Sequence, residues 1–457
     1  MSTSNYFAIE EAILGGPWER SAVEARLRTI LKPIGRATWV KPIVRRVWTA
    51  FGTSVLPPRR FLLHRLLVHD DWVCFKLSHA QDLSDWLQPG LLTFPDSLLL
   101  PPAVMTPDPR LPALDTPSLP TGGQLAAWLN LTPGEMDWFA DQYGQERQRP
   151  EGPLRHYRYL WRTKKSGGLR LLESPKPRLK AVQRAILDGI LSHIPPHAAA
   201  HAYRSGRSVR TAIAPHAGQR VVLHIDLREF FPSITASRVF AVMRTVGYPE
   251  RVARLLTGLC TNSVPHDVLK TLYPLNAASR ETERLLRRPH LPQGAPTSPA
   301  LANLCAYRLD VRLAALAQRT GAVYTRYADD LVFSGGRELL RMLPQFRVLV
   351  CAIAISEGFE IRRRKTRVMI RGGRQQLSGI VVNAQPNIPR SEFDALKALL
   401  FNCIRFGADS QNRDQHPHFR EHLRGRIAWW AQVNPLRAKK LSLLFDKIVW
   451  AEPSTGE

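Results

Sequence analysis

The stretch Y-T-R-Y-A-D-D-L-V-F-S-G, from Tyr324 to Gly335, constrains the fold of this chain more than any other feature. Two adjacent acids, Asp329 and Asp330, separate two segments that are rich in aromatic and β-branched residues. Such segments around a short polar break are typical of a β-hairpin. The acids could simply form the turn, since aspartate is common in turns. Alternatively, the hairpin holds two carboxylates at its tip to bind metal.

A second apolar segment also ends on an acid. Residues 221–226, V-V-L-H-I-D, are dense in β-branched residues and end at Asp226. Alone, Asp226 could be a surface residue after a strand, because a buried carboxylate is costly without a cation. With Asp329 and Asp330, it would complete a group of acids delivered by two strands. Mg²⁺ prefers oxygen ligands, and two such ions stabilise the attacking and leaving oxygens of a phosphoryl displacement. We therefore expect a nucleotidyl-transfer site with two Mg²⁺ ions.

The distribution of charge indicates the partner of this site. The chain carries a net charge of +26. Residues 1–120 hold 13 Lys and Arg against 11 Asp and Glu, a net of +2, whereas residues 121–457 hold 51 against 27, a net of +24. A strongly basic region is typical of a protein that binds nucleic acid. A membrane surface is a weaker interpretation, because the charge is not gathered on one amphipathic helix.

Composition argues against several other classes. The five cysteines are scattered singly without a C-x-x-C pair, so a zinc site is not expected. The longest apolar run, near Val348 to Ile355, is far shorter than the ~18 residues of a membrane-spanning helix. The first residues lack a secretory pattern. We expect a cytoplasmic protein with no membrane partner.

Proline content divides the chain into four predicted parts. Nine prolines fall within the 32 residues from Pro89 to Pro120, which indicates a linker or an irregular strap over a surface. We therefore expect an N-terminal module of unknown role over residues 1–88 and a Pro-rich linker over 89–123. A catalytic region over 124–383 and a helical C-terminal part over 384–457 follow.

The N-terminal module has two interpretations. The segment from Arg26 to Ala50 holds seven basic residues and no acid, with Trp39 and Trp48 among them. This composition is compatible with an arm that contacts RNA. It is equally compatible with a pair of amphipathic helices that expose a solvated basic face.

Strand and helix patterns alternate in the basic region. A strand, a Gly-Gly turn and a second strand are predicted from Tyr157 onward, and a helix is predicted from Pro177. Another helix is predicted after Pro299, running to about Gln318. Thr132, followed by Pro133, predicts a helix start. The fold class is therefore mixed α+β.

The segment Y-A-D-D-L-V-F-S-G resembles the metal-binding motif of bacterial retron-type reverse transcriptases. Four further segments resemble motifs of this family in the family's order, and the resemblance covers roughly residues 124–450. It implies RNA-directed DNA polymerase activity and the right-hand polymerase fold, with fingers, palm and a helical thumb. The four segments are K-K-S-G-G-L-R (164–170), H-I-D-L-R-E-F-F-P-S-I (224–234), L-P-Q-G-A-P-T-S-P-A-L-A-N-L (291–304) and G-F-E-I-R-R-R-K-T (358–366).

The resemblance implies roles for the acids and their neighbours. Asp226 and Asp329 would be the main ligands of the two Mg²⁺ ions, with Asp330 as the neighbouring acid and the Leu227 carbonyl as an additional ligand. Phe231 would lie under the sugar of the incoming nucleotide and exclude a ribose 2′-hydroxyl. Ordinary core packing is the alternative for this ring.

Other residues would bind the incoming dNTP. The Gln293 amide can hydrogen-bond, and Gly294 allows a close approach between the backbone and the nucleotide. Cations of the first and last motifs would contact the phosphates, although a solvated hairpin is the alternative for the first. These candidate cations are Lys164, Lys165, Arg170 and Lys365.

Two partial matches favour the retron subtype. Residues 207–216 resemble the N-A-x-x-H element of retron enzymes, with Thr211 in place of Asn, and residues 377–383 resemble the V-T-G element, with Ser378 in place of Thr. The subtype implies a structured noncoding RNA that is copied into branched RNA–DNA, called msDNA, from a guanosine 2′-hydroxyl. It also implies anti-phage defence with an effector protein. The nucleic-acid contacts are then expected at Arg207, His216, Arg424 and Arg426.

Three alternatives stay open at this stage. The chain could be another defence-associated or group II-like reverse transcriptase that makes no branched msDNA. It could also be a non-catalytic RNA-binding protein on a polymerase scaffold, although all three acids are present. Finally, His216 could be a structural histidine rather than an RNA contact.

Overall fold

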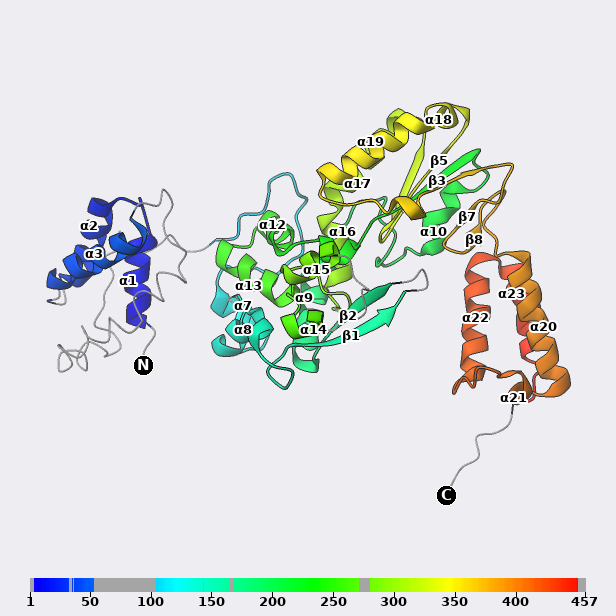
Figure 1. Ribbon diagram of the computed structural model, residues 1–457, viewed down its shortest axis with the longest axis horizontal. Helices are drawn as coiled ribbons and strands as arrows, with labels where there is room; N and C mark the ends of the chain where they lie inside the picture. The colour runs from blue at the N-terminus through cyan, green and yellow to red at the C-terminus, as the bar shows by residue number, and fades with distance from the viewer. Residues whose placement is uncertain are drawn as a thin grey trace, which may run out of the picture. The chain divides into compact units, whose positions relative to one another are not determined.

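The computed structural model describes residues 4–32, 35, 37–52, 104–142, 144–164, 168–270 and 280–450. The chain forms two compact units, Met1–Val104 and Met105–Glu457, which we describe separately (Figure 1). Lys165 and the first half of the predicted linker, residues 89–103, lie outside the described residues.

The described residues of the first unit form three α-helices with a core of their own. They are α1 (Ser4–Leu14), α2 (Arg20–Leu31) and α3 (Val40–Phe51), and a short 3₁₀ turn, Ala37–Trp39, precedes the last. Apolar residues recur three and four positions apart along α2 and α3 and pack into a cluster separate from those of the second unit. This part of the chain therefore has the interior of an independent helical bundle.

The basic residues of this unit divide into two groups. Arg26 turns inward, and its Nε donates to the Ala12 carbonyl at 2.7 Å, satisfying a backbone acceptor near the end of α1. Others point to solvent, so the predicted basic arm is partly a capping device and partly a solvated face. The exposed ones are Arg28, Lys32, Lys41 and Arg45.

A four-stranded antiparallel sheet organises the second unit. Its strands are β3 (Val221–Asp226), β4 (Val323–Tyr327), β5 (Asp330–Gly335) and β6 (Arg367–Ile370), in the spatial order β4-β5-β3-β6. The predicted hairpin is β4–β5, and the predicted acid-bearing strand is β3, its neighbour. Both sequence predictions of strands are confirmed.

Both faces of this sheet are covered, which explains why residues 221–226 are apolar almost throughout. Val221, Leu223 and Ile225 belong to the main core together with surrounding helices. Val222 belongs to a second core, which includes the C-terminal helices. The alternation of side chains along β3 thus joins two cores across one strand.

Two small hairpins complete the sheet structure. β1 (Tyr157–Thr163) pairs with β2 (Leu169–Pro175), as the strand, Gly-Gly turn and strand pattern predicts. β7 (Gln376–Leu377) pairs with β8 (Ile380–Val381) between the central sheet and the C-terminal helices.

Helices surround the sheet, and the predicted mixed α+β class is confirmed. Thr132 begins its helix with a capping box, since its hydroxyl accepts from Glu135 N while the Glu135 carboxylate accepts from Thr132 N. The single helix predicted after Pro299 is two, because Ala306 departs from helical geometry with ψ near 2°. The α-helices of this unit are α7 (Gly122–Trp128), α8 (Pro133–Ala140), α9 (Pro177–Gly189), α10 (Val209–Ile213), α11 (Phe230–Ser233), α12 (Ala236–Val246), α13 (Glu250–Cys260), α14 (His266–Lys270), α15 (Arg280–Arg287), α16 (Ser298–Cys305), α17 (Tyr307–Arg319), α18 (Arg337–Arg341), α19 (Leu343–Ser356), α20 (Arg390–Phe406), α21 (Ala408–Gln411), α22 (Phe419–Val433) and α23 (Pro435–Phe445).

The described half of the Pro-rich segment, residues 104–121, lies over the second unit without forming a helix or strand. Thr106 N donates to the Gly247 carbonyl at 3.0 Å, and Tyr248 donates its hydroxyl to the Pro117 carbonyl at 3.2 Å. These contacts make it a strap on the surface of α12 and α13. Within the described residues, no helix has the length and apolarity required to cross a bilayer.

Candidate active site

Three acids meet at one end of the central sheet. Asp226 is the last residue of β3 and lies directly opposite Asp330, the first residue of β5. Asp329 belongs to the two-residue turn between β4 and β5, and its carbonyl accepts from Leu227 N at 2.9 Å. The structure therefore brings together the three acids that the sequence singles out, over a hundred residues apart.

Asp226 has an incomplete set of partners. It is 3 % exposed, and Lys365 Nζ donates to its Oδ2 at 2.9 Å. Its Oδ1 is buried and accepts no hydrogen bond, although Arg362 Nε lies 3.5 Å from it. A buried carboxylate oxygen without a donor is costly unless a cation satisfies it. The site thus fits a metal ion on this oxygen.

The grouping of the three acids changes the pKa of Asp329, the acid in the turn. Burial, and after it the neighbouring carboxylates of Asp330 and Asp226, raise the pKa of Asp329 to about 6. Like charges held close together disfavour ionisation unless a cation joins them. Mg²⁺ prefers oxygen ligands, and the carboxylates of Asp226 and Asp329 supply them from neighbouring parts of the sheet. This set of donors therefore fits the expected ions.

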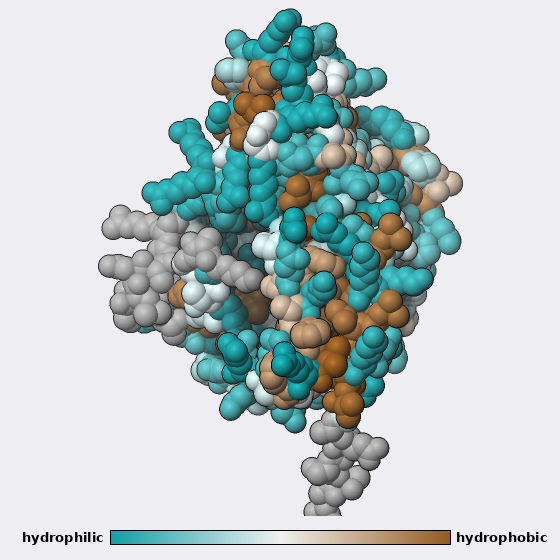
Figure 2. Space-filling view, turned by 90° about the vertical axis from the view of Figure 1, so that its right-hand side faces the viewer, coloured by the Kyte–Doolittle hydropathy of each residue, from teal (hydrophilic) through white to brown (hydrophobic). Residues whose placement is uncertain are grey.

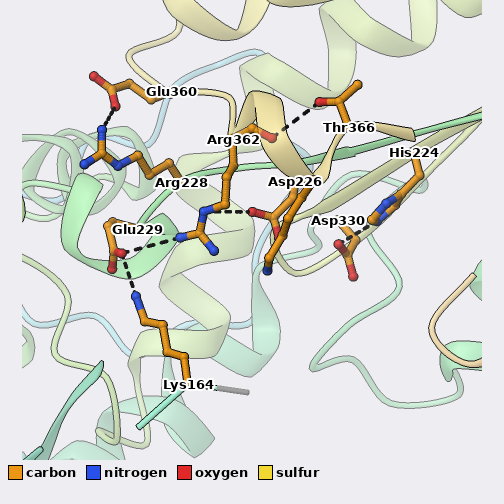
Figure 3. A network of polar contacts seen from close by, with 10 residues as sticks. Lys164, His224, Asp226, Arg228, Glu229, Asp330, Glu360, Arg362 and Thr366 are labelled. Atoms are coloured by element: carbon orange, nitrogen blue, oxygen red, sulfur yellow. Dashed lines mark hydrogen bonds and ion pairs between the residues drawn. The ribbon is translucent and has the colours of Figure 1, made fainter. Parts of the chain in front are cut away.

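Asp330 is tied to the sheet rather than left free. Its Oδ1 lies 2.7 Å from His224 Nε2, which projects from β3 two residues before Asp226 (Figure 3). Sequence reasoning missed His224, although its position inside an apolar strand was the available signal. The contact fixes the orientation of the Asp330 carboxylate.

Leu227 fixes the backbone beside the acids. Its side chain is 1 % exposed and belongs to the main core, and its peptide bridges to Ile361. Its amide is used by Asp329, as described above. The structure accounts for the position of this residue, and its carbonyl as a metal ligand stays a prediction.

An aromatic pair lies next to the acids. Phe231 is half-buried and lies 6.2 Å from the ring of Tyr203, whereas Phe230 is only 4 % exposed and packs in the core. Partial burial and then the Asp329 carboxylate raise the pKa of Tyr203, which places its phenol near the turn. Sequence reasoning missed Tyr203. Its exposed ring and left-handed backbone, with φ of 57°, mark it as part of the same surface.

The loop with Gln293 and Gly294 packs against β2. The Gln293 carbonyl accepts from Glu173 N at 2.9 Å. Gly294 has φ of +134°, and a Cβ there would lie 2.9 Å from the Glu173 carbonyl oxygen. The glycine is thus required for a close approach between this loop and the β1–β2 hairpin. The contact of Gly294 with an incoming nucleotide stays a prediction.

A buried ion pair holds the same loop. His290 Nε2 lies 3.0 Å from Glu173 Oε1, and both side chains are fully buried. Burial alone would lower the pKa of His290, but the Glu173 carboxylate and hydrogen bonds to both ring nitrogens raise it on balance. Asn262 donates to the other Glu173 oxygen at 2.8 Å. Sequence reasoning missed this network, which links β2 to the residues just before Gln293.

The expected phosphate-binding cations lie in different surroundings. Lys164, at the end of β1, donates from Nζ to Glu229 Oε1 at 2.7 Å (Figure 3). Lys365 pairs with Asp226, as described above. Arg170 is exposed on β2, and Lys165 lies outside the described residues.

A buried arginine supports the acidic turn. Arg326 of β4 forms a fork with Asp310 of α17, with Nε to Oδ1 at 2.8 Å and Nη2 to Oδ2 at 2.6 Å. Its Nη1 donates to Asn303 Oδ1 at 3.0 Å and to the Ala328 carbonyl at 3.2 Å. Ala328 has φ of 56°, a conformation that costs a side-chain-bearing residue about 1–2 kcal/mol. The fork therefore holds the turn in a strained shape.

The residues expected to contact nucleic acid are also divided. Arg207 is exposed on the loop before α10. His216 is fully buried, and its ring nitrogens lie 2.7 Å from Ser334 Oγ and 2.8 Å from Thr325 Oγ1. This is the geometry of the structural histidine that the sequence left as an alternative.

The remaining two expected contacts lie on α22. Arg424 is exposed, whereas Arg426 is half-buried and lines a surface pocket of about 400 Å³ together with Trp429 and Trp430. Trp430 is 3 % exposed and Trp429 is 37 % exposed, so only the second can reach a partner. Figure 2, turned so that the side of the C-terminal helices faces the viewer, shows hydrophobic patches among hydrophilic ones.

Carboxylates gathered at the tip of a β-hairpin and on the adjacent strand, with cations around them, are the arrangement that two-metal phosphoryl transfer in nucleic-acid polymerases requires. The model of the family described as reverse transcriptase (RNA-dependent DNA polymerase) matches residues 162–399. The chain belongs to this family, which implies the right-hand polymerase fold, and its relatives identify it as a retron-type member.

Several similar proteins are retron reverse transcriptases of Myxococcus xanthus and Escherichia coli. The chain is 42 % identical to the retron Mx65 reverse transcriptase of Myxococcus xanthus, over 64 % of this chain and 65 % of that relative, just under two thirds of its length. It is 32 % identical to the retron Mx162 reverse transcriptase of the same species, over 86 % of this chain and 79 % of the relative. The retron Ec86 reverse transcriptase of Escherichia coli matches at 29 % over 61 % of this chain and 77 % of the relative.

Proposed function

We propose that this protein copies a structured noncoding RNA into msDNA, the branched RNA–DNA of retrons, by RNA-directed DNA synthesis. The observation that carries the proposal is the register of Asp226 opposite Asp330, with Asp329 in the turn between them. A non-catalytic RNA-binding protein gives no reason for a buried, unsatisfied oxygen at this place. Another reverse transcriptase would have the same site, and the similarity to retron enzymes is what favours msDNA as the product.

Asp226 and Asp329 would hold two Mg²⁺ ions, with Asp330 beside them and the Leu227 carbonyl as a further ligand. Bound Mg²⁺ supplies an activated primer hydroxyl and charge neutralisation of the leaving pyrophosphate. The protein supplies the fixed geometry of the acids. His224 orients Asp330, and the Arg326 fork holds the turn that carries Asp329.

Other side chains bind and select the nucleotide. Lys164, Arg170 and Lys365 are assigned to the phosphates, with Lys165 as a fourth candidate. Phe231 lies under the sugar and excludes a 2′-hydroxyl, which selects dNTPs. Gln293 and Gly294 contact the nucleotide from a loop whose other face is packed on β2.

The domains of a right-hand polymerase are assigned accordingly. Residues 124–383 form fingers and palm, with β1–β2 as the fingers hairpin and the central sheet as the palm. Residues 384–457 form the thumb, and Arg424 and Arg426 contact the template duplex through its phosphates. Arg207 contacts RNA near the palm. Residues 1–88 form an additional module, joined by the segment 89–123.

The biological setting follows from the retron relatives. The noncoding RNA provides both template and primer, and synthesis begins at a guanosine 2′-hydroxyl. The product acts in anti-phage defence together with an effector protein, in the cytoplasm, where RNA and dNTPs are available.

The test of catalysis replaces the acids of the turn. Asp329→Ala with Asp330→Ala should abolish dNTP incorporation on an RNA template, since these groups have no substitute at the site. The matched control is Glu281→Gln, which removes an acid that pairs with Arg228 and hydrogen-bonds Glu360 rather than any of the three acids, and which should retain activity. Incorporation that survives the double substitution would overturn the assignment.

The test of the product is separate. Nucleic acid that co-purifies with the wild-type protein is sequenced before and after enzymatic debranching. We expect a DNA joined to RNA whose end becomes readable only after debranching. An unbranched DNA product would favour a defence-associated reverse transcriptase of another kind.

A further inference from the structure

Glu229 joins two cations that come from opposite sides of the candidate site. Lys164 Nζ, at the end of β1, lies 2.7 Å from Glu229 Oε1. Arg362 Nη2, from the segment before β6, lies 3.5 Å from the same oxygen. Figure 3 shows both side chains pointing at this carboxylate, and Arg362 continuing to Asp226. One acid therefore holds the β1–β2 hairpin and the central sheet together.

Glu229 lies, along the chain, between two residues that are proposed to contact the metal and the nucleotide. It stands three residues after Asp226, the proposed metal ligand, and two residues before Phe231, the proposed sugar contact. The Glu229 carboxylate lies between Lys164 and Arg362, two cations that could instead contact the phosphates of a nucleotide bound beside Asp226.

The contacts are those of a partly buried anion site rather than of a fully exposed ion pair. The side chains of Lys164 and Glu229 are each 15 % exposed, and that of Arg362 is 26 % exposed. Solvent screening is weaker for such pairs than for exposed ones. A carboxylate between an ammonium and a guanidinium offers the same charge-assisted contacts that a phosphate oxygen would offer.

The backbone at Glu229 is strained. Its φ is 44° and its ψ is 50°, a left-handed conformation that residues with a Cβ adopt at a cost. Strain of this kind persists where the surroundings over-determine it, which is frequent at ligand-binding segments. Glu229 is thus held toward the two cations by a conformation that it would not choose alone.

We propose that Glu229 is a positioning residue that occupies the triphosphate site before substrate binds, and that the triphosphate of the incoming dNTP displaces its carboxylate from Lys164 and Arg362. The proposal rests on the proposed polymerase function and specifies how its substrate site is held ready. A triphosphate carries several negative charges and more acceptor oxygens than one carboxylate, so it wins the exchange.

The test is Glu229→Gln, which keeps the size of the side chain and removes its charge. Because the competing anion is gone, the KM for dNTP in RNA-templated extension should fall by about three- to tenfold, with kcat changed less than KM. A second measurement uses inorganic tripolyphosphate as probe, with EDTA and no dNTP. It should raise the melting temperature of the variant more than that of the wild type.

Lys164→Ala provides a check on the mechanism. In that background Glu229→Gln should lower KM by a smaller factor, because one of the two released cations is absent. Glu281→Gln is the matched control, since this acid pairs with Arg228 nearby but not with Lys164 or Arg362, and it should leave KM unchanged.

The outcomes separate the two proposals. A wild-type protein that incorporates no dNTP would overturn the proposed function. A wild type that is active, with an unchanged or higher KM in Glu229→Gln, would overturn the present inference alone. An equal tripolyphosphate effect on both proteins would also overturn it.

Discussion

His216 shows how one buried side chain acquires a fixed protonation state. Thr325 donates its hydroxyl to the Ala212 carbonyl at 2.9 Å, so its oxygen accepts from His216 Nε2. His216 Nδ1 is then the acceptor for the Ser334 hydroxyl. The neutral ring satisfies all three groups, and the histidine joins β4 to β5 behind the acidic turn.

This residue predicts a pH dependence of stability. Burial lowers the pKa of His216 to about 3, well below its value of about 6.5 in the unfolded chain. Between these values the unfolded state binds more protons than the folded state. The contribution of His216 is therefore complete above pH 6.5 and is lost as the pH falls toward 3, by about 1.4 kcal/mol per unit.

The measurement is urea denaturation at pH 7, 6 and 5 for the wild type and for His216→Asn. Because other histidines are buried in this protein, the expected quantity is the difference between the two slopes. The variant should be less stable at pH 7 and should lose less stability on acidification. Parallel slopes would show that His216 titrates normally in the folded protein.

At the scale of elements, the β4–β5 hairpin depends on α16 and α17. The fork of Arg326 with Asp310 joins β4 to α17, and Nη1 joins both to Asn303 of α16 and to the turn. Both charged side chains are fully buried. Asn303 also donates to the Ala202 carbonyl, next to Tyr203. One network thus positions the turn with Asp329 and the loop with Tyr203.

Removing one member of this network should strongly lower the stability of the protein. Arg326→Met leaves the Asp310 carboxylate buried without a cation, which typically costs about 3–5 kcal/mol of unfolding free energy. Arg326→Met with Asp310→Leu should recover part of this loss, because no buried charge remains. Denaturant unfolding of the three proteins checks both statements. A loss of less than about 1 kcal/mol in the single variant would mean that water reaches Asp310.

At the scale of the whole molecule, the two units have separate interiors. Among the described residues, the buried core of the first unit runs from Ile9 to Val47, and the cores around the central sheet contain none of these residues. The strap at residues 104–121 packs on the second unit. The candidate active site therefore draws its described contacts from the second unit.

A protein that begins at Met105 should consequently fold and retain synthesis. We expect its kcat on an unrelated RNA template to stay within about twofold of the full chain, because no described contact of the acids involves the first unit. Primer extension and circular dichroism check this. A protein that is folded but more than tenfold slower would assign the first unit a direct part in catalysis.

Much of this architecture could be predicted from the sequence. The period and composition of residues 221–226 and 324–335 predict two strands, and the acids at their ends predict that the carboxylates meet. The helix start at Thr132 and the pairing of β1 with β2 are predicted correctly, since their signals act within a few residues. The roles of the site residues themselves stay predictions.

Other features depended on contacts between distant segments. Periodicity indicates that His216 or His290 could be buried, but it does not name Ser334 or Glu173 as the partner. Trp429 and Trp430 have the same sequence context, and only their place on α22 leaves one exposed and the other buried.

The sequence by itself determined the fold class, the position of the three acids and the excess of basic residues after residue 120, because strand periodicity, turn chemistry and charge are local or additive properties. Only the tertiary structure decided which cations meet which acids. Lys164 and Glu229 are 65 residues apart, and Lys365 and Asp226 are 139 apart. Such pairs form because the packed cores bring these segments together. The sequence of either segment alone does not predict that the two side chains meet.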